Sequence, residues 1–428
     1  MTSGRTIRIG LLGCGTVGTS FVQLIDQQRD AIAARTGLEL TVDAISVRDT
    51  SRARDGVDPS LLTTDSASIV TNPDIDVIVE TIGGIDGTKE LVETALASGK
   101  PVITANKELL AHHGPELFAA ASAAGVDLSF EASVAAGIPF IRPLRESLVG
   151  ENITRVMGIL NGTTNYILSQ MTEHGAGYAD ALGEAQRLGF AEADPTADVE
   201  GFDAGSKAAI IATLAFGQSV TAENVHIEGI SNITAEDISN AARMGHVIKL
   251  LGVIDRDDAG AIGVRVHPAM VSADHPLASV RDSFNAVFVE GDGVDQLMFY
   301  GRGAGGHPTA AMMVGDTIDA AINVVAGTHR DLGALAPATI KPVSELVSAF
   351  YVSLDARDEP GALASIAAAF GNRGVSIRSM EQEGLGDQAR LVFITHEAVE
   401  ADLRATLADL NGIDAVKNVG QVLRVVCD

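Results

Sequence analysis

Two charged side chains stand alone in a long apolar segment and could carry proton chemistry. In residues 201–217 the only charges are Asp203 and Lys207. Their i,i+4 spacing puts them on one face of a helix, and the rest of that helix is apolar on every side, which is typical of burial. A buried ammonium is costly unless it is paired or its pKa falls, and a lysine tuned in this way is a good proton donor or acceptor. The alternative is an ordinary ion pair at an exposed helix start.

Carboxylates are dense just before this lysine. Five occur within twelve residues: Glu192, Asp194, Asp198, Glu200 and Asp203. They could form a divalent-metal loop, although the residue order and glycine of an EF-hand are absent. They could equally form a solvated acidic face, or an acidic pocket for the amino group of a substrate. The residues alone leave these three interpretations open.

A glycine-rich turn near the N-terminus has the spacing of a dinucleotide loop. It reads Gly13-Cys14-Gly15-Thr16-Val17-Gly18, after an apolar run and before a helical pattern. The first glycine allows the tight turn, the second lets the backbone approach a pyrophosphate, and the third lets helix and strand pack closely. In this context the motif predicts a dinucleotide site rather than a simple tight turn.

Charged residues after the second expected strand bear on the cofactor. Arg48, with Arg52 and Arg54 behind it, suits the 2′-phosphate of NADP, whereas Asp49 suits the ribose hydroxyl of NAD. We prefer NADP(H) and keep NAD(H) as possible; a solvated charged turn is the alternative. Lys107 follows the fourth expected strand, where it could reach a cofactor or a substrate carboxylate, or could simply be solvated.

Alternating apolar runs and helical patterns predict the elements that must position these residues. Strands are expected over residues 7–12, 40–47, 77–80, 102–104 and 126–130, with a helix over 16–35. This alternation predicts the α/β class with a Rossmann-type, doubly wound parallel sheet. Helices over 208–216 and 309–325 and a strand over 286–290 indicate an α+β second domain. Strands over 350–354, 375–381, 390–395 and 421–426, with helices over 361–370 and 398–410, form a ferredoxin-like βαββαβ unit.

Composition excludes several classes of partner. The chain has 428 residues with 56 acidic and 30 basic side chains, a formal net charge of −26, so nucleic acid and anionic membranes are not expected partners. No stretch approaches the roughly 18 apolar residues that span a bilayer; the longest candidate covers residues 208–217. The two cysteines, Cys14 and Cys427, provide neither a disulfide framework nor a metal site. We therefore expect a cytoplasmic protein.

Taken together, the motifs resemble homoserine dehydrogenase over nearly the whole chain. The resemblance is carried by residues 13–18, 80–84, 104–107, 131–139, 161–165 (Asn-Gly-Thr-Thr-Asn), 189–195 and 198–203 leading to Lys207. The C-terminal unit resembles an ACT domain, an amino-acid-sensing module, through residues 358–363 and 372–376. The expected domains are a dinucleotide-binding domain (1–131), a catalytic and dimerisation domain (132–327, of which part of 300–327 could pack back on the first), a linker (328–346) and the ACT domain (347–428).

The resemblance implies NAD(P)H-dependent interconversion of L-aspartate 4-semialdehyde and L-homoserine, in threonine, methionine and isoleucine biosynthesis. It implies that Lys207 is the proton donor, that Asp203 positions the substrate and that Lys107 lies at the junction of cofactor and substrate. Glu192, Asp198 and Thr163 would also bind substrate. The implied cofactor contacts are Gly13, Gly15, Thr16, Val17, Gly18, Arg48, Thr81, Lys107, Gly189 and Gly303.

The same resemblance implies a bound ion, an effector and an oligomer. Sodium would bind Glu131 and the carbonyls of Val134, Ala136 and Ile138, and threonine would bind near Gly361, Asn372 and Gly374. A homodimer or homotetramer is expected, with residues near 132–150 and 300–325 at the interface. Arg302 departs from the proline that the family often has in the second glycine turn, which leaves the conformation of that turn open.

Two rival functions are less consistent with these residues. Aspartate-semialdehyde dehydrogenase needs a thiolate nucleophile, and neither Cys14 nor Cys427 is well placed for one. A non-enzymatic dinucleotide sensor would need neither Lys207 in an apolar helix beside acids nor Glu192.

Overall fold

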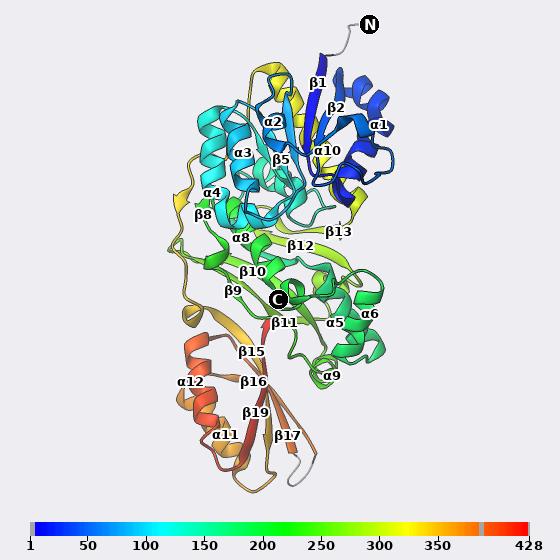
Figure 1. Cartoon of the computed structure of the whole chain (residues 1–428). Coiled ribbons are helices and arrows are strands. Elements are labelled where there is room, and N and C mark those ends of the chain that lie inside the picture. The colour runs from blue at the N-terminus through cyan, green and yellow to red at the C-terminus, as the bar shows by residue number, and fades with distance from the viewer. Residues whose placement is uncertain (1–4, 385–388, 427–428) are drawn as a thin grey trace. The chain divides into compact units, whose positions relative to one another are not determined.

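The computed structural model describes residues 5–384 and 389–426, so Cys427 lies outside the described residues. The chain divides into two compact units (Figure 1). The first comprises Met1–Arg155, Ser206–Val225 and Asn285–Ala338, and the second comprises Val156–Gly205, His226–Phe284 and Thr339–Asp428. Helix α8 (Phe202–Phe216) begins in the second unit and continues in the first.

The first unit is built on a six-stranded parallel sheet in the order β3-β2-β1-β4-β5-β6. Its strands are β1 (Arg5–Leu12), β2 (Leu38–Ser46), β3 (Leu62–Thr63), β4 (Val77–Glu80), β5 (Val102–Thr104) and β6 (Leu128–Ser129). Its helices are α1 (Thr16–Thr36), α2 (Ser66–Thr71), α3 (Thr88–Ala97), α4 (Lys107–Ala124) and α10 (Gly306–Ala326). Figure 1 shows α1 and α10 on one face of this sheet and α2, α3 and α4 on the other. The predicted doubly wound sheet is confirmed, with β3 as an additional strand.

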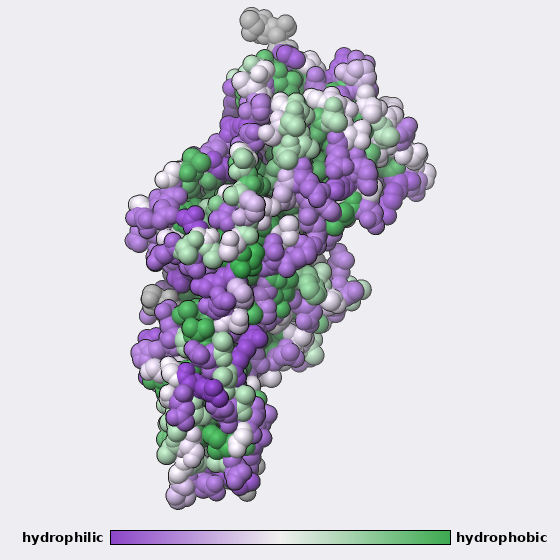
Figure 2. Space-filling model, turned by 90° about the vertical axis from the view of Figure 1, so that its left-hand side faces the viewer, coloured by the Kyte–Doolittle hydropathy of each residue, from purple (hydrophilic) through white to green (hydrophobic). Residues whose placement is uncertain are grey.

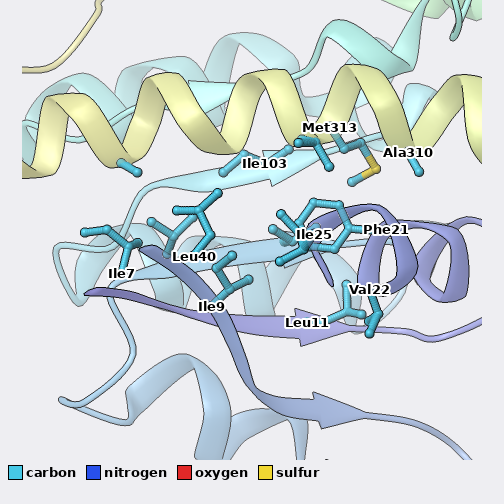
Figure 3. Packing of buried hydrophobic residues seen from close by; sticks show 14 of the residues in the cluster. Ile7, Ile9, Leu11, Phe21, Val22, Ile25, Leu40, Ile103, Ala310 and Met313 are labelled. Carbon is cyan, nitrogen blue, oxygen red and sulfur yellow. The ribbon is translucent and has the colours of Figure 1, made fainter. Parts of the chain in front are cut away.

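Helix α10 completes the core of the first unit although it lies far along the chain. Figure 3 shows Phe21 of α1, Met313 of α10 and Ile7 and Ile9 of β1 in one apolar layer between α10 and the sheet. All four side chains are fully buried. Removing this much aliphatic and aromatic surface from water holds the helix against the sheet.

The same helix is the one described segment long and apolar enough, by length and composition alone, to cross a membrane. The sequence prediction that no stretch approaches this length missed α10, because Asp316 and Asp319 interrupt its apolar residues. The core helix of a soluble protein passes the same test, and one face of α10 is packed in the core. On the face of the molecule in Figure 2, hydrophobic residues lie in small groups among hydrophilic ones.

Four further strands belong to the first unit. They are β12 (Phe284–Gly291), β13 (Asp295–Arg302), β8 (Gln218–Ser219) and β14 (Ala336–Pro337). Strands β12 and β13 are neighbours, and β8 pairs with β14 in parallel. The segment expected to be a linker therefore contains a short strand that is paired within the unit.

The second unit contains an extended sheet in the order β7-β10-β11-β19-β15-β17-β16, with β9 beside β11 and β18 beside β15. Its strands are β7 (Ile153–Ile159), β9 (His226–Ile227), β10 (His246–Arg256), β11 (Ile262–Ser272), β15 (Val347–Ala356), β16 (Ile377–Glu383), β17 (Ala389–Thr395), β18 (Ala398–Val399) and β19 (Val416–Val426). Its helices are α5 (Gly162–His174), α6 (Tyr178–Arg187), α7 (Thr196–Val199), α9 (Ala235–Arg243), α11 (Ala362–Asn372) and α12 (Glu400–Leu410).

The C-terminal part of this unit has the expected ferredoxin-like order, β19-β15-β17-β16, and its pairs are antiparallel. Helices α11 and α12 lie together on one face (Figure 1), and the core between them and the sheet contains Phe350, Ile366, Phe370 and Phe393. Strand β19 also pairs in parallel with β11, so the sheet of the module continues into the rest of the unit. The predicted βαββαβ module is confirmed, and it shares its sheet with its neighbour.

A buried arginine reinforces this shared strand. Arg424 of β19 is only 7% exposed, and its guanidinium donates to Glu400 at 3.0 and 3.1 Å and to Glu228 at 3.0 Å. Burial raises the pKa of Glu228, but hydrogen bonds with His226 and Arg424 outweigh burial and hold that pKa well below its usual range. Charge pairing of this kind is needed because an unpaired buried guanidinium would be very costly.

Asp316 fixes α10 to the loop that follows β6. Its carboxylate accepts the backbone N–H of Glu131 at 2.8 Å and a guanidinium N–H of Arg142 at 3.0 Å. The side chain is almost fully buried, and burial raises the pKa of Asp316 to about 7. In the folded protein this carboxyl group therefore holds its proton far above the pH at which an unfolded aspartate releases it.

This shift predicts a pH-dependent stability. Because the folded-state pKa is raised, the contribution of Asp316 is fully present below about pH 4 and is lost as the pH rises through 7. The slope is at most about 1.4 kcal/mol per pH unit. We expect the Tm to fall between pH 5.5 and 7.5 and the fall to be smaller in Asp316→Asn. Asp319→Asn is the matched control, since Asp319 also pairs with Arg142 but is more exposed. Parallel pH profiles for the wild type and Asp316→Asn would contradict this role of Asp316.

Candidate active site

The glycine loop has two positions where a side chain does not fit. Gly13 has φ +90°, and a Cβ there would lie 2.8 Å from the carbonyl oxygen of Thr81. A Cβ on Gly18 would lie 2.6 Å from the carbonyl oxygen of Gly13. Glycine is therefore required at both positions for β1, β4 and α1 to pack this closely.

Gly15 differs, because no atom lies within 4 Å of a Cβ built on it. Gly15 is also the N-cap of α1, and no side chain caps that helix. The first amide groups of α1, at Thr16 and Val17, thus begin a helix beside open space, an arrangement that suits an anion. The residues present fit the pyrophosphate of a dinucleotide.

Thr81 contacts the loop itself. Its hydroxyl donates to the carbonyl of Gly13 at 3.0 Å, and its N–H donates to the carbonyl of Leu12 at 2.7 Å. In this structure Thr81 shapes the loop to which the cofactor is expected to bind.

The charged turn after β2 divides its arginines between two roles. Arg54 donates through Nε to the carbonyl of Cys14 at 2.9 Å and through its other nitrogens to the carbonyls of Arg52 and Asp49. Arg54 therefore ties this turn to the glycine loop. The carboxylate of Asp49 accepts two hydrogen bonds from Ser51, which lower its pKa. Arg48 and Arg52 are exposed and are the guanidinium groups here that could meet a 2′-phosphate.

Lys107 is the first residue of α4, directly after β5. Asn106 caps this helix by accepting the N–H of Leu109 at 3.1 Å. Lys107 is half-buried. Because β4 and β5 are adjacent and parallel, the start of α4 lies at the edge of the sheet where ligands bind in such folds.

Glu131 is held by backbone amides. One carboxylate oxygen accepts from Phe140 at 2.5 Å and Ile141 at 2.7 Å, and the other accepts from Arg142 at 2.7 Å. Burial raises the pKa of Glu131, and these amides oppose that rise. The carboxylate expected to bind sodium thus already accepts three backbone N–H groups. These hydrogen bonds fix residues 140–142 at the end of the 131–142 loop.

The carbonyls of this loop are a better fit to a cation. Within residues 5–384 and 389–426, no hydrogen bond reaches the carbonyl oxygens of Val134, Ala136 or Ile138. Ala135 has φ +50°, a conformation that side-chain-bearing residues rarely adopt. Carbonyl oxygens are suitable ligands for a hard cation, so the residues present fit the expected ion.

The second glycine turn is anchored on two sides. The carbonyl of Arg302 accepts the N–H of Gly137 at 3.0 Å, so the start of this turn is bonded to the 131–142 loop. A Cβ on Gly303 would overlap the side-chain amide of Asn285, so glycine is required there. A Cβ on Gly306 would lie 2.7 Å from the hydroxyl oxygen of Ser20 in α1.

In the second unit, Asn161 brings two of the acids together. Its amide nitrogen donates to Asp198 at 2.7 Å and to Asp203 at 2.9 Å, while its amide oxygen accepts the N–H of Thr164 and caps α5. The sequence motif contains Asn161 but does not identify it as a site residue. Its place before a glycine at a helix start is a signal for capping, but not for the link to Asp203.

Asp203 and Lys207 lie one turn apart on α8 and are buried, with exposed fractions of 6% and 8%. The buried helix expected from the sequence is therefore found, and the exposed ion pair is excluded. All residues of α8 from Ala204 to Thr213 are buried. A charge in such a place needs nearby polar groups to compensate its lost hydration.

The remaining residues assigned to substrate or cofactor lie on the segment between α6 and α7. The hydroxyl of Thr163 donates to the carbonyl of Phe190 at 2.6 Å and supports this segment. Gly189, with φ +78°, and Glu192 are exposed, and the carbonyl of Glu192 accepts from Gln186.

The acidic stretch does not assemble a divalent-metal site in the described part of the chain. No group of three or more His, Cys, Asp or Glu side chains there could hold a metal ion. Instead the acids have separate partners: Asp194 accepts from Thr196, Glu200 accepts from Ser231, and Asp198 and Asp203 accept from Asn161.

The thiol that the rival dehydrogenase would need is not presented to a substrate. Cys14 is buried, and its Sγ lies 3.6 Å from the hydroxyl oxygen of Thr19.

Comparison with known proteins agrees with this geometry. Three family models match the chain: homoserine dehydrogenase over residues 139–318, the NAD binding domain of homoserine dehydrogenase over 13–131, and the ACT domain over 350–415. The homoserine dehydrogenase of Corynebacterium glutamicum is 48% identical, over 99% of this chain and 97% of that protein.

Solved structures give the same result. The homoserine dehydrogenase from Thiobacillus denitrificans has a TM-score of 0.94 and 40% identity, over 99% of this chain and 98% of that chain. A hyperthermophilic archaeal homoserine dehydrogenase in complex with NADPH has a TM-score of 0.64 and 28% identity, over 74% of this chain and 98% of that chain. This chain therefore belongs to the homoserine dehydrogenase family: it is an oxidoreductase with an NAD-binding domain and a C-terminal ACT domain.

Proposed function

We propose that this protein reduces L-aspartate 4-semialdehyde to L-homoserine with NAD(P)H, in the synthesis of threonine, methionine and isoleucine. The observation that carries the proposal is the buried pair Asp203 and Lys207 on α8, with Asn161 donating to Asp203. An aldehyde reductase needs a proton donor shielded from water, and a buried ammonium meets that need. The proposed place of action is the cytoplasm.

The chemistry divides between cofactor and chain. When bound, the reduced nicotinamide supplies a hydride to the carbonyl carbon of the aldehyde. Lys207 donates a proton to the carbonyl oxygen as negative charge grows there, so the carbonyl becomes a neutral alcohol. The lysine amine then recovers its proton from solvent. Asp203, held by Asn161, positions the substrate beside the lysine.

The substrate is itself an amino acid, so it brings an ammonium and a carboxylate. Glu192 and Asp198 are the proposed partners of the ammonium, with Thr163 supporting their segment through Phe190. Lys107 is the proposed partner of the substrate carboxylate, at the junction of substrate and cofactor. The ammonium and the carboxylate are both on the α-carbon, so binding both would fix that end of the substrate and orient the aldehyde at its other end.

The proposed cofactor is NADP(H) in preference to NAD(H). The support is electrostatic: Arg48 and Arg52 are exposed at the end of β2, while Asp49 is turned toward Ser51. A guanidinium is well suited to a phosphate because it can donate two parallel hydrogen bonds. Gly189 and Gly303 are proposed to approach the nicotinamide through their backbones.

We also propose sodium at the 131–142 loop. The carbonyls of Val134, Ala136 and Ile138 would be its main ligands, since the carboxylate of Glu131 already accepts three amides. The positive charge of the ion would then offset the negative oxygen ends of these carbonyl dipoles, which lie beside a buried carboxylate.

Threonine is the proposed effector, and the helix geometry restricts how it could bind. Gly361 caps the start of α11, with φ +95°, whereas Asn372 ends that helix and Gly374 follows it. Eleven helical residues rise roughly 16 Å, too far for one threonine to touch both ends in one chain. We therefore place the effector between two copies of the chain, in line with the proposed homodimer or homotetramer.

The role of Lys207 is tested by substitution. Lys207→Ala should lower kcat at least a hundredfold, in line with the roughly 10²–10⁴ of general acid loss. Lys207→Arg should not restore the rate, because a guanidinium keeps the charge but does not release its proton. Cofactor affinity should stay nearly unchanged in both. Lys89→Ala, which removes a half-buried lysine of α3 that pairs with Glu93 and Glu116, should behave as wild type. If Lys207→Ala retains activity within tenfold, the donor lies elsewhere, and Lys107 is the next candidate.

Cofactor choice is tested at Arg48. Arg48→Ala should weaken NADP⁺ binding by about 1.5–3 kcal/mol, the value of a hydrogen bond to a charged group, and leave NAD⁺ binding nearly unaffected. Arg35→Ala, which removes an exposed arginine in the last turn of α1, is the control for loss of a surface charge and should weaken neither cofactor. Dissociation constants for both dinucleotides decide the matter. If Arg48→Ala weakens the binding of NADP⁺ and NAD⁺ equally, Arg48 does not bind the 2′-phosphate. That result would favour Asp49 as the residue that binds a ribose hydroxyl.

Effector binding is tested at Asn372. Asn372→Ala should raise the threonine concentration for half-inhibition about fivefold to tenfold, the effect of one hydrogen bond, and leave the rate without threonine unchanged. Asn411→Ala removes an equally exposed asparagine after α12 and should have no effect. A wild-type enzyme that ignores millimolar threonine would remove the proposal altogether.

A further inference from the structure

Glu80, which no function above uses, connects two segments of the first unit. It is the last residue of β4 and is fully buried, with an exposed fraction of 0%. One carboxylate oxygen accepts the backbone N–H groups of Ile82 at 2.6 Å and Gly83 at 3.0 Å. The other accepts the hydroxyl of Thr104 at 2.5 Å. A single side chain thus joins the turn after β4 to the end of β5.

The connection continues from Thr104 to the start of α4. The hydroxyl oxygen of Thr104 accepts the N–H of Asn106 at 2.9 Å. The side chain of Asn106 donates back to the carbonyl of Gly84 at 2.6 Å and caps α4 by accepting the N–H of Leu109. Lys107 is the first residue of that helix. Its backbone is therefore fixed relative to the turn at residues 81–84.

The same turn lies against the glycine loop. Thr81 donates to the carbonyls of Leu12 and Gly13, and a Cβ on Gly13 would lie only 2.8 Å from the carbonyl of Thr81. The hydrogen bonds of Glu80, Asn106 and Thr81 together therefore link three parts: the glycine loop, the turn after β4 and the start of α4.

Stability alone gives little reason to place a carboxylate here. Within the described residues Glu80 has no cationic partner, and burial raises its pKa against the effect of its three donors. A neutral side chain of similar size would avoid the cost of desolvating a charge. The acceptor capacity of a carboxylate does serve one purpose, because it satisfies donors from both segments at once.

We propose that Glu80 is a positioning residue that holds Lys107 at the correct place relative to the bound dinucleotide. This inference rests on the proposed function, because it takes Lys107 to act at the junction of cofactor and substrate. Glu80 itself touches neither ligand; it acts through Thr104 and Asn106.

The test uses the full-length chain and two readouts, the dissociation constant for NADP⁺ and the Tm. Glu80→Gln keeps the size of the side chain but presents an NH₂ group to Thr104, whose hydroxyl then loses its acceptor. We expect the dissociation constant to rise about tenfold, with the Tm equal to or above that of the wild type. Glu93→Gln makes the same chemical change on the exposed face of α3 and should alter neither the dissociation constant nor the Tm.

A double-mutant cycle separates positioning from a merely structural effect. If Glu80 acts through Lys107, Glu80→Gln combined with Lys107→Ala should bind NADP⁺ no more weakly than Lys107→Ala alone. Additive losses would overturn the proposal, as would a dissociation constant for Glu80→Gln within twofold of the wild type.

Substitutions at Thr104 provide an independent check if Glu80→Gln folds poorly. Thr104→Val removes the hydroxyl and should reproduce the tenfold weakening, whereas Thr104→Ser keeps the donor and should restore wild-type binding. Wild-type binding by both variants would overturn the proposal. Failure of the proposed function would give a different result. The wild-type chain would then oxidise homoserine with neither dinucleotide, while the NADP⁺ dissociation constants of the double-mutant cycle could still be measured.

Discussion

Burial of charge is the constraint on which the candidate site depends. Every residue of helix α8 from Asp203 to Thr213 is buried, so Asp203 and Lys207 cannot rely on bulk water. The amide of Asn161 compensates part of this loss by donating to Asp203, and the same residue caps α5. An exposed pair with this spacing would contribute little to stability, and a buried one has a desolvation cost that its interactions need not repay. The pair is therefore better explained by chemistry than by folding.

Much of the fold could be predicted from local patterns, and the exceptions share a physical cause. The glycine loop, β4, β5 and the βαββαβ module are predictable because each combines apolar periodicity with a turn signal. Strands β10 and β11 were not predicted, since both of their faces are mostly buried and the alternation that marks a strand disappears. The sequence allowed part of residues 300–327 to pack back on the first domain, but which side chains of α10 enter that core depends on long-range packing, which leaves no local signature.

The candidate site was predictable where one residue type is unusual in its surroundings. Lys207 is a charge in an apolar helix, and Gly13 and Gly18 are glycines at a strand–helix turn. Asn161 and Glu80 were missed as functional residues because their roles depend on partners far along the chain, Asp203 for one and Thr104 for the other. Polar residues of this kind are common, and only the tertiary structure shows which of them connect two segments.

The shared strand determines how the regulatory module can be studied. β19 pairs with β11, and Arg424 on it binds Glu228. The segment after Glu228 in turn bonds to α7, since the N–H of Ile230 donates to the carbonyl of Val199, next to Asp198. Removing residues beyond 339 would expose an edge of β11 and leave Glu228 without its guanidinium, so lost activity in such a truncation could reflect damage to the acidic segment. Point substitutions on α11 leave this connection intact and are the cleaner probe of regulation.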